Sequence, residues 1–240
     1  VVKYVSLRLV LALAAVMCWS VHQIDVDTAF LYAPMTEELY MKQPEGFEVT
    51  GAKGEKLVCK LKKSLYGTRQ ASRNWNITLC TVLKELGFSQ SMVDPGVFTN
   101  IIEGGTYIVL VYVDDMIIIG PNIKCIEDFK NSMKRRFKIK DLGQAQWVLG
   151  IEVKIDKSKN SICIKQTKYI DDMLCRYNME NCKPVDTPMV SGQVEDGSRL
   201  LDNTHSQLFR SILGSLMYVM VCTRPEVGFA VNLLNLNNNT

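Results

Sequence analysis

Two neighbouring carboxylates, Asp114 and Asp115, interrupt the apolar segment 108–119, which reads IVLVYVDDMIII. The pair makes a poor hairpin turn, because two-residue turns favour Asn-Gly or Asp-Gly and adjacent anions repel one another. Such repulsion costs on the order of 1 kcal/mol or more unless a cation neutralises it. Mg²⁺ is a natural candidate, since it takes hard oxygen ligands, usually carboxylates together with phosphates and water. A solvated acidic turn is the alternative interpretation.

A second acidic pair, Asp25 and Asp27, lies at the end of a short strand predicted over 22–26. If this strand lies beside the segment that carries Asp114 and Asp115, three carboxylates meet at one point. A cluster of that kind can hold two metal ions about 4 Å apart, which activate an attacking oxygen and stabilise a leaving pyrophosphate. The spacing alone leaves open whether the two strands are neighbours.

The elements that must position these residues belong to an ordinary globular chain. Its 240 residues are 47% hydrophobic and 22% charged, which excludes a disordered tail, a collagen and a disulfide-dominated miniprotein. Helix and strand patterns intermix without a regular βαβ repeat, so we predict an α+β fold. The predicted helices span 6–20, 71–86, 124–137, 167–177 and 209–223. The predicted strands span 22–26, 106–113, 116–119, 147–155 and 161–165, and 180–206 is predicted to be a long connection.

Positive charge is concentrated in two segments, although the net charge is only +3. Residues 53–73 hold seven basic residues and one acid, and residues 130–140 hold six basic residues and no acid. The remainder of the chain is therefore acidic. Two basic surfaces on an acidic body suit a polyanionic partner, whereas two well-solvated lysine-rich faces are the alternative.

Cysteine usage and the apolar N-terminal run limit the class further. Eight cysteines form no CxxC pair and only two histidines are present, so we expect no zinc site and free thiols in a reducing compartment. The apolar run 9–19 follows two basic residues, as a signal-peptide core does, but it is too short to span a bilayer. Its Ala- and Leu-rich composition favours a buried helix. Because the chain does not begin with Met, we expect it to be an internal fragment.

The motifs, taken in order, resemble the reverse transcriptase of copia-type LTR retrotransposons, and the resemblance covers essentially the whole chain. They are QIDVDTAFL (23–31), ELYMKQPEGF (38–47), LVCKLKKSLYGTRQASRNW (57–75), LVYVDD (110–115), FKIKDLGQAQWVLGIEV (137–153), KQTKYIDDMLCRYNM (165–179), CKPVDTP (182–188) and RSILGSLMYVMVCTRPEVGFAVNLL (210–234). The resemblance implies a polymerase palm-type antiparallel sheet flanked by helices, with partial fingers and a helical thumb-like C-terminal part. It places fingers and palm in 1–165, and thumb-like helices and a connection, truncated before RNase H, in 166–240.

The resemblance also implies a catalytic metal centre. Asp25, Asp114 and Asp115 would be the catalytic carboxylates, and together with the backbone carbonyl of Val26 they would hold two Mg²⁺ ions, which Mn²⁺ can replace. Asp114 is expected to be the firmer ligand and Asp115 partly a tuning group. The implied reaction is attack of a primer 3′-hydroxyl on the α-phosphate of a deoxynucleoside triphosphate.

Further residues match the nucleotide site of that family. Phe30 matches a bulky ring beneath the sugar of the incoming nucleotide, which would collide with a 2′-hydroxyl; a buried core Phe is the alternative. Three residues of the SLYGTRQ segment match the loop beneath template and incoming base, and they are Tyr66, Gly67 and Gln70. Gly67 would allow the backbone to approach closely.

The implied partners are an RNA template, a DNA primer and deoxynucleoside triphosphates. The candidate nucleic-acid contacts are Lys62, Lys63, Arg69, Arg73, Gly150 and Gly214. Gly150 lies in 147–153, which resembles the primer-grip hairpin, and Gly214 lies in 210–234, which resembles thumb helices that follow a minor groove. Contacts of the basic side chains with phosphates are sequence-independent and sensitive to salt. The RNase H and integrase portions of a parent polyprotein are further expected partners, no membrane is expected, and the expected location is a cytoplasmic retroelement particle or the nucleus.

Several positions depart from the family pattern. Ser72 stands where the family usually has Pro, Tyr32 and Ala33 where it has Asn-Gly, and residues 18–21 where it has a polar, acidic stretch. The family's triphosphate-gripping fingers segment lies upstream, so we expect weak or no polymerisation by this chain alone. A catalytically inactive relic that binds RNA–DNA hybrid weakly is the first alternative. A two-metal nuclease is the second, and it lacks a general base, since His22 and His205 fall in no suitable constellation.

Overall fold

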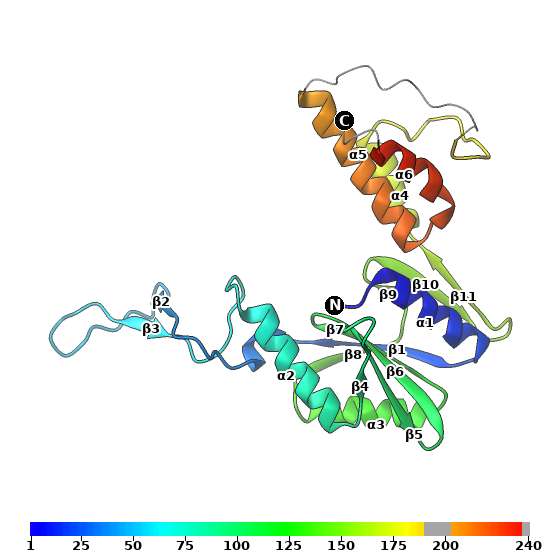
Figure 1. The fold of residues 1–240 in the computed structure, drawn as a ribbon. Helices are drawn as coiled ribbons and strands as arrows, with labels where there is room; N and C mark the ends of the chain where they lie inside the picture. The colour runs from blue at the N-terminus through cyan, green and yellow to red at the C-terminus, as the bar shows by residue number, and fades with distance from the viewer. Residues whose placement is uncertain (190–202, 237–240) are drawn as a thin grey trace. The chain divides into compact units, whose positions relative to one another are not determined.

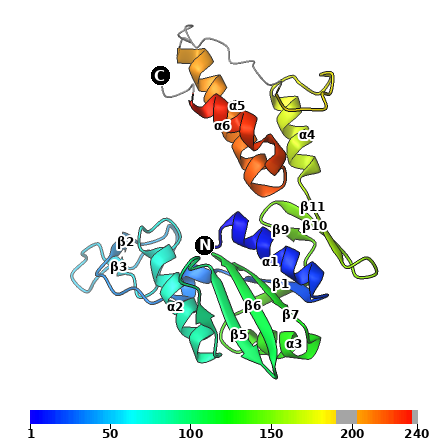
Figure 2. The same cartoon turned by 45° about the vertical axis from the view of Figure 1, so that its right-hand side comes forward.

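Six antiparallel strands form the central sheet, in the order β4-β5-β6-β7-β1-β8 (Figure 1). Their bounds are β1 Ser20–Val26, β4 Ser89–Gln90, β5 Val97–Ile102, β6 Gly105–Tyr112, β7 Asp115–Gly120 and β8 Ile139–Gln144. Figure 2 shows β5, β6 and β7 side by side, as their antiparallel registers require. This computed structural model describes residues 1–189 and 203–236. The mixture of helices with an antiparallel sheet confirms the predicted α+β class.

The chain divides into two units. The first contains Val1–Lys3 and Met17–Ala145, and the second contains Tyr4–Val16 and the described residues from Gln146 onward. The boundary expected between residues 165 and 166 does not coincide with this division. Whether it separates a palm from a thumb-like part stays a prediction.

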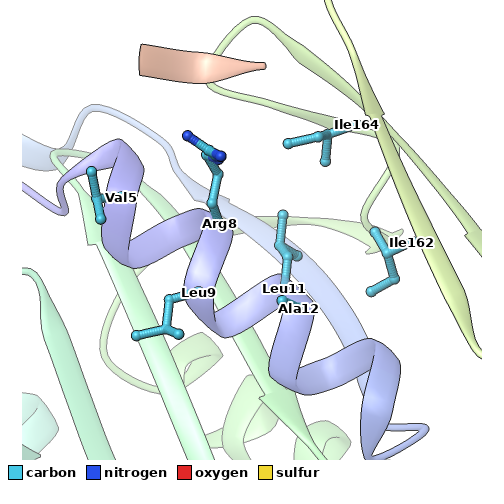
Figure 3. Close-up of a pocket in the computed structure, with 7 residues that line it drawn as sticks. All are labelled: Val5, Arg8, Leu9, Leu11, Ala12, Ile162 and Ile164. Atoms are coloured by element: carbon cyan, nitrogen blue, oxygen red, sulfur yellow. The ribbon is translucent and has the colours of Figure 1, made fainter. Parts of the chain in front are cut away.

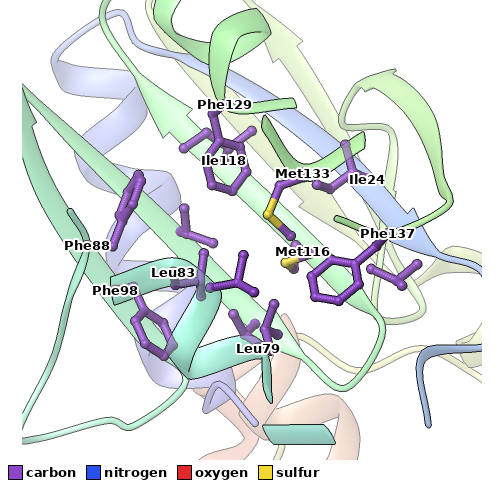
Figure 4. Packing of buried hydrophobic residues seen from close by; sticks show 14 of the residues in the cluster. Ile24, Leu79, Leu83, Phe88, Phe98, Met116, Ile118, Phe129, Met133 and Phe137 are labelled. Atoms are coloured by element: carbon purple, nitrogen blue, oxygen red, sulfur yellow. The ribbon is translucent and has the colours of Figure 1, made fainter. Parts of the chain in front are cut away.

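Two helices, α2 (Ala71–Glu85) and α3 (Ile123–Lys134), bury their apolar stripes against one face of the six-stranded sheet. Along α2 the buried positions recur at helical spacing, as the sequence predicted. Alternate residues of β1 and β7 supply the facing layer. Figure 4 shows this packing, whose labelled members are Ile24, Leu79, Leu83, Phe88, Phe98, Met116, Ile118, Phe129, Met133 and Phe137. Burying each large side chain contributes about 1.5–3 kcal/mol before the entropy of ordering it is subtracted.

Three strands of this sheet, β4, β5 and β8, were not predicted. The predicted helix 124–137 extends to Phe137, the first residue of an FKIK alternation, whereas α3 ends at Lys134 and the alternating residues lead into β8. β8 is an edge strand that pairs only with β1, so most of its side chains are polar and its apolar signal is weak. The predicted helix 6–20 is also too long, because Ser20 already pairs with Gly120 of β7.

The first unit also contains a short 3₁₀ helix and a small two-stranded sheet. The helix η1 (Ala29–Tyr32) follows β1, and β2 (Tyr40–Lys42) pairs with β3 (Val58–Lys60). Downstream of β3, the amide of Ser64 donates to the carbonyl of Ala33 at 2.9 Å, so the chain returns beside the end of η1.

The second unit contains a three-stranded sheet, β11-β10-β9, and four helices among its described residues. The bounds are α1 Tyr4–Val16, β9 Trp147–Val148, β10 Ile151–Asp156, β11 Ser161–Lys165, α4 Thr167–Arg176, α5 Asn203–Cys222 and α6 Gly228–Leu236, with a short 3₁₀ helix, η2, at Pro225–Val227. The predicted hairpin over 147–165 is confirmed, with an additional turn between β9 and β10. Of the predicted connection 180–206, residues 190–202 lie outside the described residues, as does the expected frayed end 237–240.

Helix α1 accounts for the apolar N-terminal run. The predicted helix is confirmed, but only one of its faces is buried: Leu7, Val10, Leu11 and Ala14 are buried, whereas Leu9, Leu13 and Val16 are exposed. A shallow groove between α1 and β11 is lined mainly by aliphatic side chains (Figure 3): Val5, Arg8, Leu9, Leu11, Ala12, Ile162 and Ile164. Among the described residues, no helix combines the length and the hydropathy needed to cross a membrane.

Candidate functional site

The register of β1 and β7 brings two of the predicted carboxylates together. Asp25, near the end of β1, lies directly opposite Asp115, the first residue of β7. The amide of Val26 donates to the carbonyl of Asp114 at 3.0 Å, which places the third carboxylate-bearing residue at the same end of the strand pair. Residues nearly ninety positions apart in the sequence are thus neighbours, and the two strands whose adjacency the spacing left open are paired.

The turn that carries Asp114 differs by one residue from the expectation. The turn residues are Val113 and Asp114, because Asp115 already pairs with Tyr112 across the hairpin. Val113 has a φ of 59°, a left-handed conformation that is unfavourable for a β-branched residue. The indole Nε1 of Trp75 donates to the Val113 carbonyl at 2.6 Å and so ties the turn to α2. This tertiary hydrogen bond is the physical reason that a local turn rule misplaced the hairpin.

Asp25 and Asp115 lie at the end of a sheet face that is otherwise buried. Side chains alternate between the two faces of a strand, so Asp25 shares its face with Val21 and Gln23, and Asp115 shares it with Ile117. Val21, Gln23 and Ile117 are all buried. Gln23 Nε2 donates to Asp115 Oδ1 at 3.1 Å, which orients that carboxylate. Sequence reasoning missed Gln23, although its place two residues before Asp25 on one strand was a usable signal.

The charged groups around Asp25 are mostly negative. Burial raises the pKa of Asp25, and the charges of Asp114 and Asp115 raise it further. Lys140 opposes this only in part, because its Nζ lies 3.9 Å from Asp25 Oδ2. The Asp25 side chain keeps 28% of its surface exposed, so a cation from solvent can reach it.

Asp27 is neutralised by two lysines, one in β8 and one just before that strand. Lys138 and Lys140 each place Nζ 3.0 Å from an oxygen of Asp27. Their hydrogen bonds hold the pKa of Asp27 below its ordinary value. From the sequence, these two lysines were predicted only as members of a basic surface. Their alternation with apolar residues in FKIK is the strand signal that could have placed them beside the acidic pair.

The predicted basic surface over 130–140 is wrong for Lys130. Its side chain is only 1% exposed, and its Nζ lies 2.9 Å from Glu127 Oε1 and from Asp141 Oδ1 and 2.8 Å from His22 Nδ1. The amphipathic turn of α3 directs this position inward, where carboxylates of α3 and β8 compensate the charge. Arg136 is also paired, with Glu85 at 2.8 Å, so several of the positive charges of this segment are held in ion pairs and it is not a uniform cationic patch.

The donor set suits a divalent cation in its chemistry. Asp25, Asp114 and Asp115 offer hard carboxylate oxygens, the ligand type that Mg²⁺ prefers, and their mutual repulsion favours a cation between them. Within residues 1–189 and 203–236, however, no three His, Cys, Asp or Glu side chains are gathered closely enough to form a ready metal-binding group. Strand pairing therefore brings the backbones of the three aspartates together, but in the described part of the chain their side chains are not arranged to coordinate one ion.

Two residues predicted separately to contact a nucleotide touch one another. Phe30 in η1 packs against Tyr66, with ring centroids 4.6 Å apart and planes tilted by 42°. Tyr66 is 51% exposed, and Phe30 is half-buried at the edge of the core rather than within it. Val26, a further predicted residue of the site, is buried, and its amide donates to the carbonyl of Asp114.

The remaining predicted contacts lie at the surface of one unit or the other. Gly67 has a φ of +91° and open space where a Cβ would stand, and Gln70 precedes the first turn of α2 without capping it through its side chain. The four basic residues of the first unit are exposed: Lys62, Lys63, Arg69 and Arg73. In the second unit, Gly150 occupies the β9–β10 turn with a φ of +80°, and Gly214 is an exposed position of α5 with open space around it.

Replacing Asp25 with asparagine should stabilise the metal-free protein. The pKa of Asp25 is raised on folding, so the folded state is penalised as pH rises through that pKa, and the neutral amide removes the penalty. We expect a gain of about 0.5 kcal/mol at pH 7, the scale of one cross-strand charge pair. The gain should vanish well below the ordinary pKa of 3.8, where Asp25 is protonated in both states.

Urea unfolding in the presence of a chelator measures this effect. Asp27→Asn is the matched control and should change stability in the opposite direction, because the pKa of Asp27 is lowered by its lysine partners. Equal destabilisation by both substitutions would show that repulsion within the carboxylate group is not significant.

Comparison with known proteins gives a consistent result. A family model described as "Reverse transcriptase (RNA-dependent DNA polymerase)" matches residues 1–191. The chain is 41% identical over 243 residues to the retrovirus-related Pol polyprotein from transposon TNT 1-94 of Nicotiana tabacum, covering 98% of this chain and 18% of that one. It is 38% identical to the corresponding polyprotein from transposon RE1 of Arabidopsis thaliana, covering 98% and 16%. A putative transposon Ty5-1 protein of Saccharomyces cerevisiae is 29% identical over 88% of this chain and 68% of its own length. The chain thus spans less than a fifth of the length of the two plant polyproteins.

Proposed function

This chain belongs to the reverse transcriptase (RNA-dependent DNA polymerase) family found in transposon Pol polyproteins, and from that membership we propose that its six-stranded sheet is the palm of an RNA-directed DNA polymerase. In this proposal the first unit also contains part of the fingers, and α4, α5 and α6 form the thumb-like part. The reaction is transfer of a deoxynucleotide to a primer 3′-hydroxyl on an RNA template.

The observation that carries the proposal is the placement of Asp25 opposite Asp115 and beside Asp114. Asp25 and Asp114 are the proposed ligands of two Mg²⁺ ions, for which Mn²⁺ can substitute, and the carbonyl of Val26 is a further ligand. The chemistry supplied by the bound ions is activation of the primer hydroxyl and stabilisation of the charge on the leaving pyrophosphate. Asp115 tunes the site and is held in orientation by Gln23.

The contact between Phe30 and Tyr66 supports a nucleotide site next to the carboxylates. We assign Phe30 as the ring beneath the sugar, where it excludes a 2′-hydroxyl, and Tyr66 as the residue that supports it from the exposed side. Gly67 and Gln70 belong to the same SLYGTRQ segment as Tyr66. Gly67 leaves the backbone open to close approach, because no side chain covers it.

The nucleic acid is held in this proposal by backbone-directed contacts. Four exposed cations of the first unit contact phosphates, namely Lys62, Lys63, Arg69 and Arg73. In the second unit, the β9–β10 turn at Gly150 contacts the primer and the α5 surface at Gly214 follows the minor groove. The chain acts beside the RNase H and integrase portions of a longer Pol polyprotein, in a cytoplasmic particle or in the nucleus.

Binding of a labelled RNA–DNA hybrid tests the proposal on the chain itself. If all four cations contact phosphates, affinity should fall about 100-fold between 50 and 200 mM salt. Replacing the four with glutamine should flatten that dependence, whereas Lys124→Gln, an exposed lysine at the start of α3, should leave it unchanged. Affinity that is indifferent to salt would remove the basic residues from the proposal.

One observation keeps a second candidate function. Because the three carboxylates form no ready metal-binding group in the described part of the chain, a catalytically inactive relic that binds hybrid weakly is the alternative. The two candidates agree on hybrid binding and differ on primer extension, which the Asp114 substitution addresses below.

A further inference from the structure

The turn between β9 and β10 is strained. Val148 pairs with Ile151, so Leu149 and Gly150 form a two-residue hairpin turn. Both have positive φ, 50° and 80° respectively. A turn of this kind favours Asn-Gly, since a bulky residue such as leucine is disfavoured in the left-handed region. A strained turn of this sort persists only where surrounding contacts hold it.

Two tyrosine hydroxyls from different helices hold the turn at one atom. Tyr218 Oη of α5 donates to the Leu149 carbonyl at 3.3 Å, and Tyr4 Oη of α1 donates to the same carbonyl at 3.4 Å. A Cβ added at Gly150 would stand 3.1 Å from Tyr218 Oη, which is a tight contact, so the turn lies close to this hydroxyl.

The rings behind these hydroxyls are themselves held in place. Tyr4 packs edge-on against Tyr218 with centroids 5.9 Å apart, and Tyr169 of α4 packs against the same ring at 4.8 Å. Burial raises the pKa of Tyr218, so its hydroxyl stays protonated and remains a donor at neutral pH. Three helices therefore converge on one turn, an arrangement that we call the tyrosine anchor: Tyr4, Tyr169 and Tyr218.

The turn presents an uncovered surface on its other side. Gly150 is exposed. Trp147, which lies in β9 two residues before the turn, is 55% exposed. The backbone of a glycine can approach a phosphate or sugar closely, and an exposed aromatic ring near the turn can pack on the same strand. A turn that is already ordered loses less conformational entropy when it binds.

We propose that Tyr4 and Tyr218 are positioning residues that hold the Leu149–Gly150 turn in the conformation that contacts the nucleic-acid backbone, with Tyr169 fixing the Tyr218 ring. The inference rests on the proposed function, in which this turn contacts the primer. It assigns the role to two hydroxyl groups that do not themselves touch nucleic acid.

The test compares Tyr218→Phe and Tyr4→Phe with the unmodified chain, by affinity for a labelled RNA–DNA hybrid and by amide hydrogen exchange at residues 149–151. Each variant keeps the ring and loses the hydroxyl that donates to the Leu149 carbonyl, so we expect hybrid affinity to fall about three- to tenfold and exchange at the turn to become faster. The salt dependence of binding should stay the same, because no phosphate-neutralising charge is removed. Tyr169→Phe is the control and should match the unmodified chain, since within the described residues its hydroxyl makes no hydrogen bond to Leu149.

Each contrary outcome overturns a specific part. Unchanged affinity in both variants, with or without faster exchange, would make the anchor a purely structural feature and refute the inference alone. An equal loss in Tyr169→Phe would refute the assignment to the two hydroxyls. Failure of the unmodified chain to bind the hybrid at all would refute the proposed function and this inference with it.

Discussion

Asp114→Asn should reduce primer extension about 10³-fold or more while the fold is preserved. Asparagine has the shape of aspartate but lacks the negative charge that would hold a divalent cation, and without that cation the charge of the transferred phosphate would not be compensated. The backbone around residue 114 is held by contacts that the substitution does not touch, namely the Val26 amide on the Asp114 carbonyl and the Trp75 indole on Val113. The loss should therefore be chemical and not a consequence of unfolding.

The measurement is extension of a DNA primer on a homopolymer RNA template with Mg²⁺ or Mn²⁺. It is made with this chain and with a longer Pol segment that includes the residues preceding it, since we expect the chain alone to be weak. Asp128→Asn, an exposed carboxylate of α3, is the matched control and should retain full activity. Full activity of Asp114→Asn would refute the proposed site. An inactive but folded longer segment with Asp114 intact would instead favour the relic.

The candidate site was predictable as a set of residues but not as an arrangement. Asp25, Asp114 and Asp115 are visible in the sequence because carboxylates in apolar strands are unusual. Their adjacency depends on the order of the strands in the sheet. β1 lies between β7 and β8, although β7 begins almost ninety residues after β1 ends. Local patterns carry no information about such pairing. The shift of the hairpin turn by one residue has the same origin, because the Trp75 hydrogen bond comes from a different helix.

The charged residues were harder to predict than the apolar ones. The buried stripe of α2 followed directly from the spacing of its apolar residues, since the core is the one favourable environment for an apolar face, whereas a lysine has several favourable environments. Lys130 is buried among carboxylates, Lys140 neutralises Asp27, and Lys62 is exposed. Which of these applies depends on partners contributed by β8, the edge strand whose pattern was weakest. Counting charges along the sequence therefore overestimated the basic surface over 130–140.

Phe30→Val should weaken discrimination against ribonucleotides about 10- to 200-fold, the range expected when steric exclusion in a pocket is relaxed. The ring of Phe30 is half-buried and packs against Tyr66, and in the proposed site it presents the surface that a 2′-hydroxyl would strike. Valine removes the ring and leaves room for the hydroxyl. Incorporation of deoxynucleotides should change much less, because they lack the group that the ring excludes.

The ratio of kcat/KM for a deoxynucleotide to that for its ribonucleotide measures the effect, in the longer Pol segment. Phe47→Val, at an exposed phenylalanine that follows β2, is the matched control and should leave the ratio unchanged. Tyr66→Ala should produce a smaller loss of discrimination than Phe30→Val, because it removes the support of the ring and not the ring itself. If Phe30→Val lowers stability without changing the ratio, the alternative interpretation holds, and Phe30 serves only to pack the edge of the core. The two results are separable because packing affects both nucleotides equally, whereas steric exclusion affects only one.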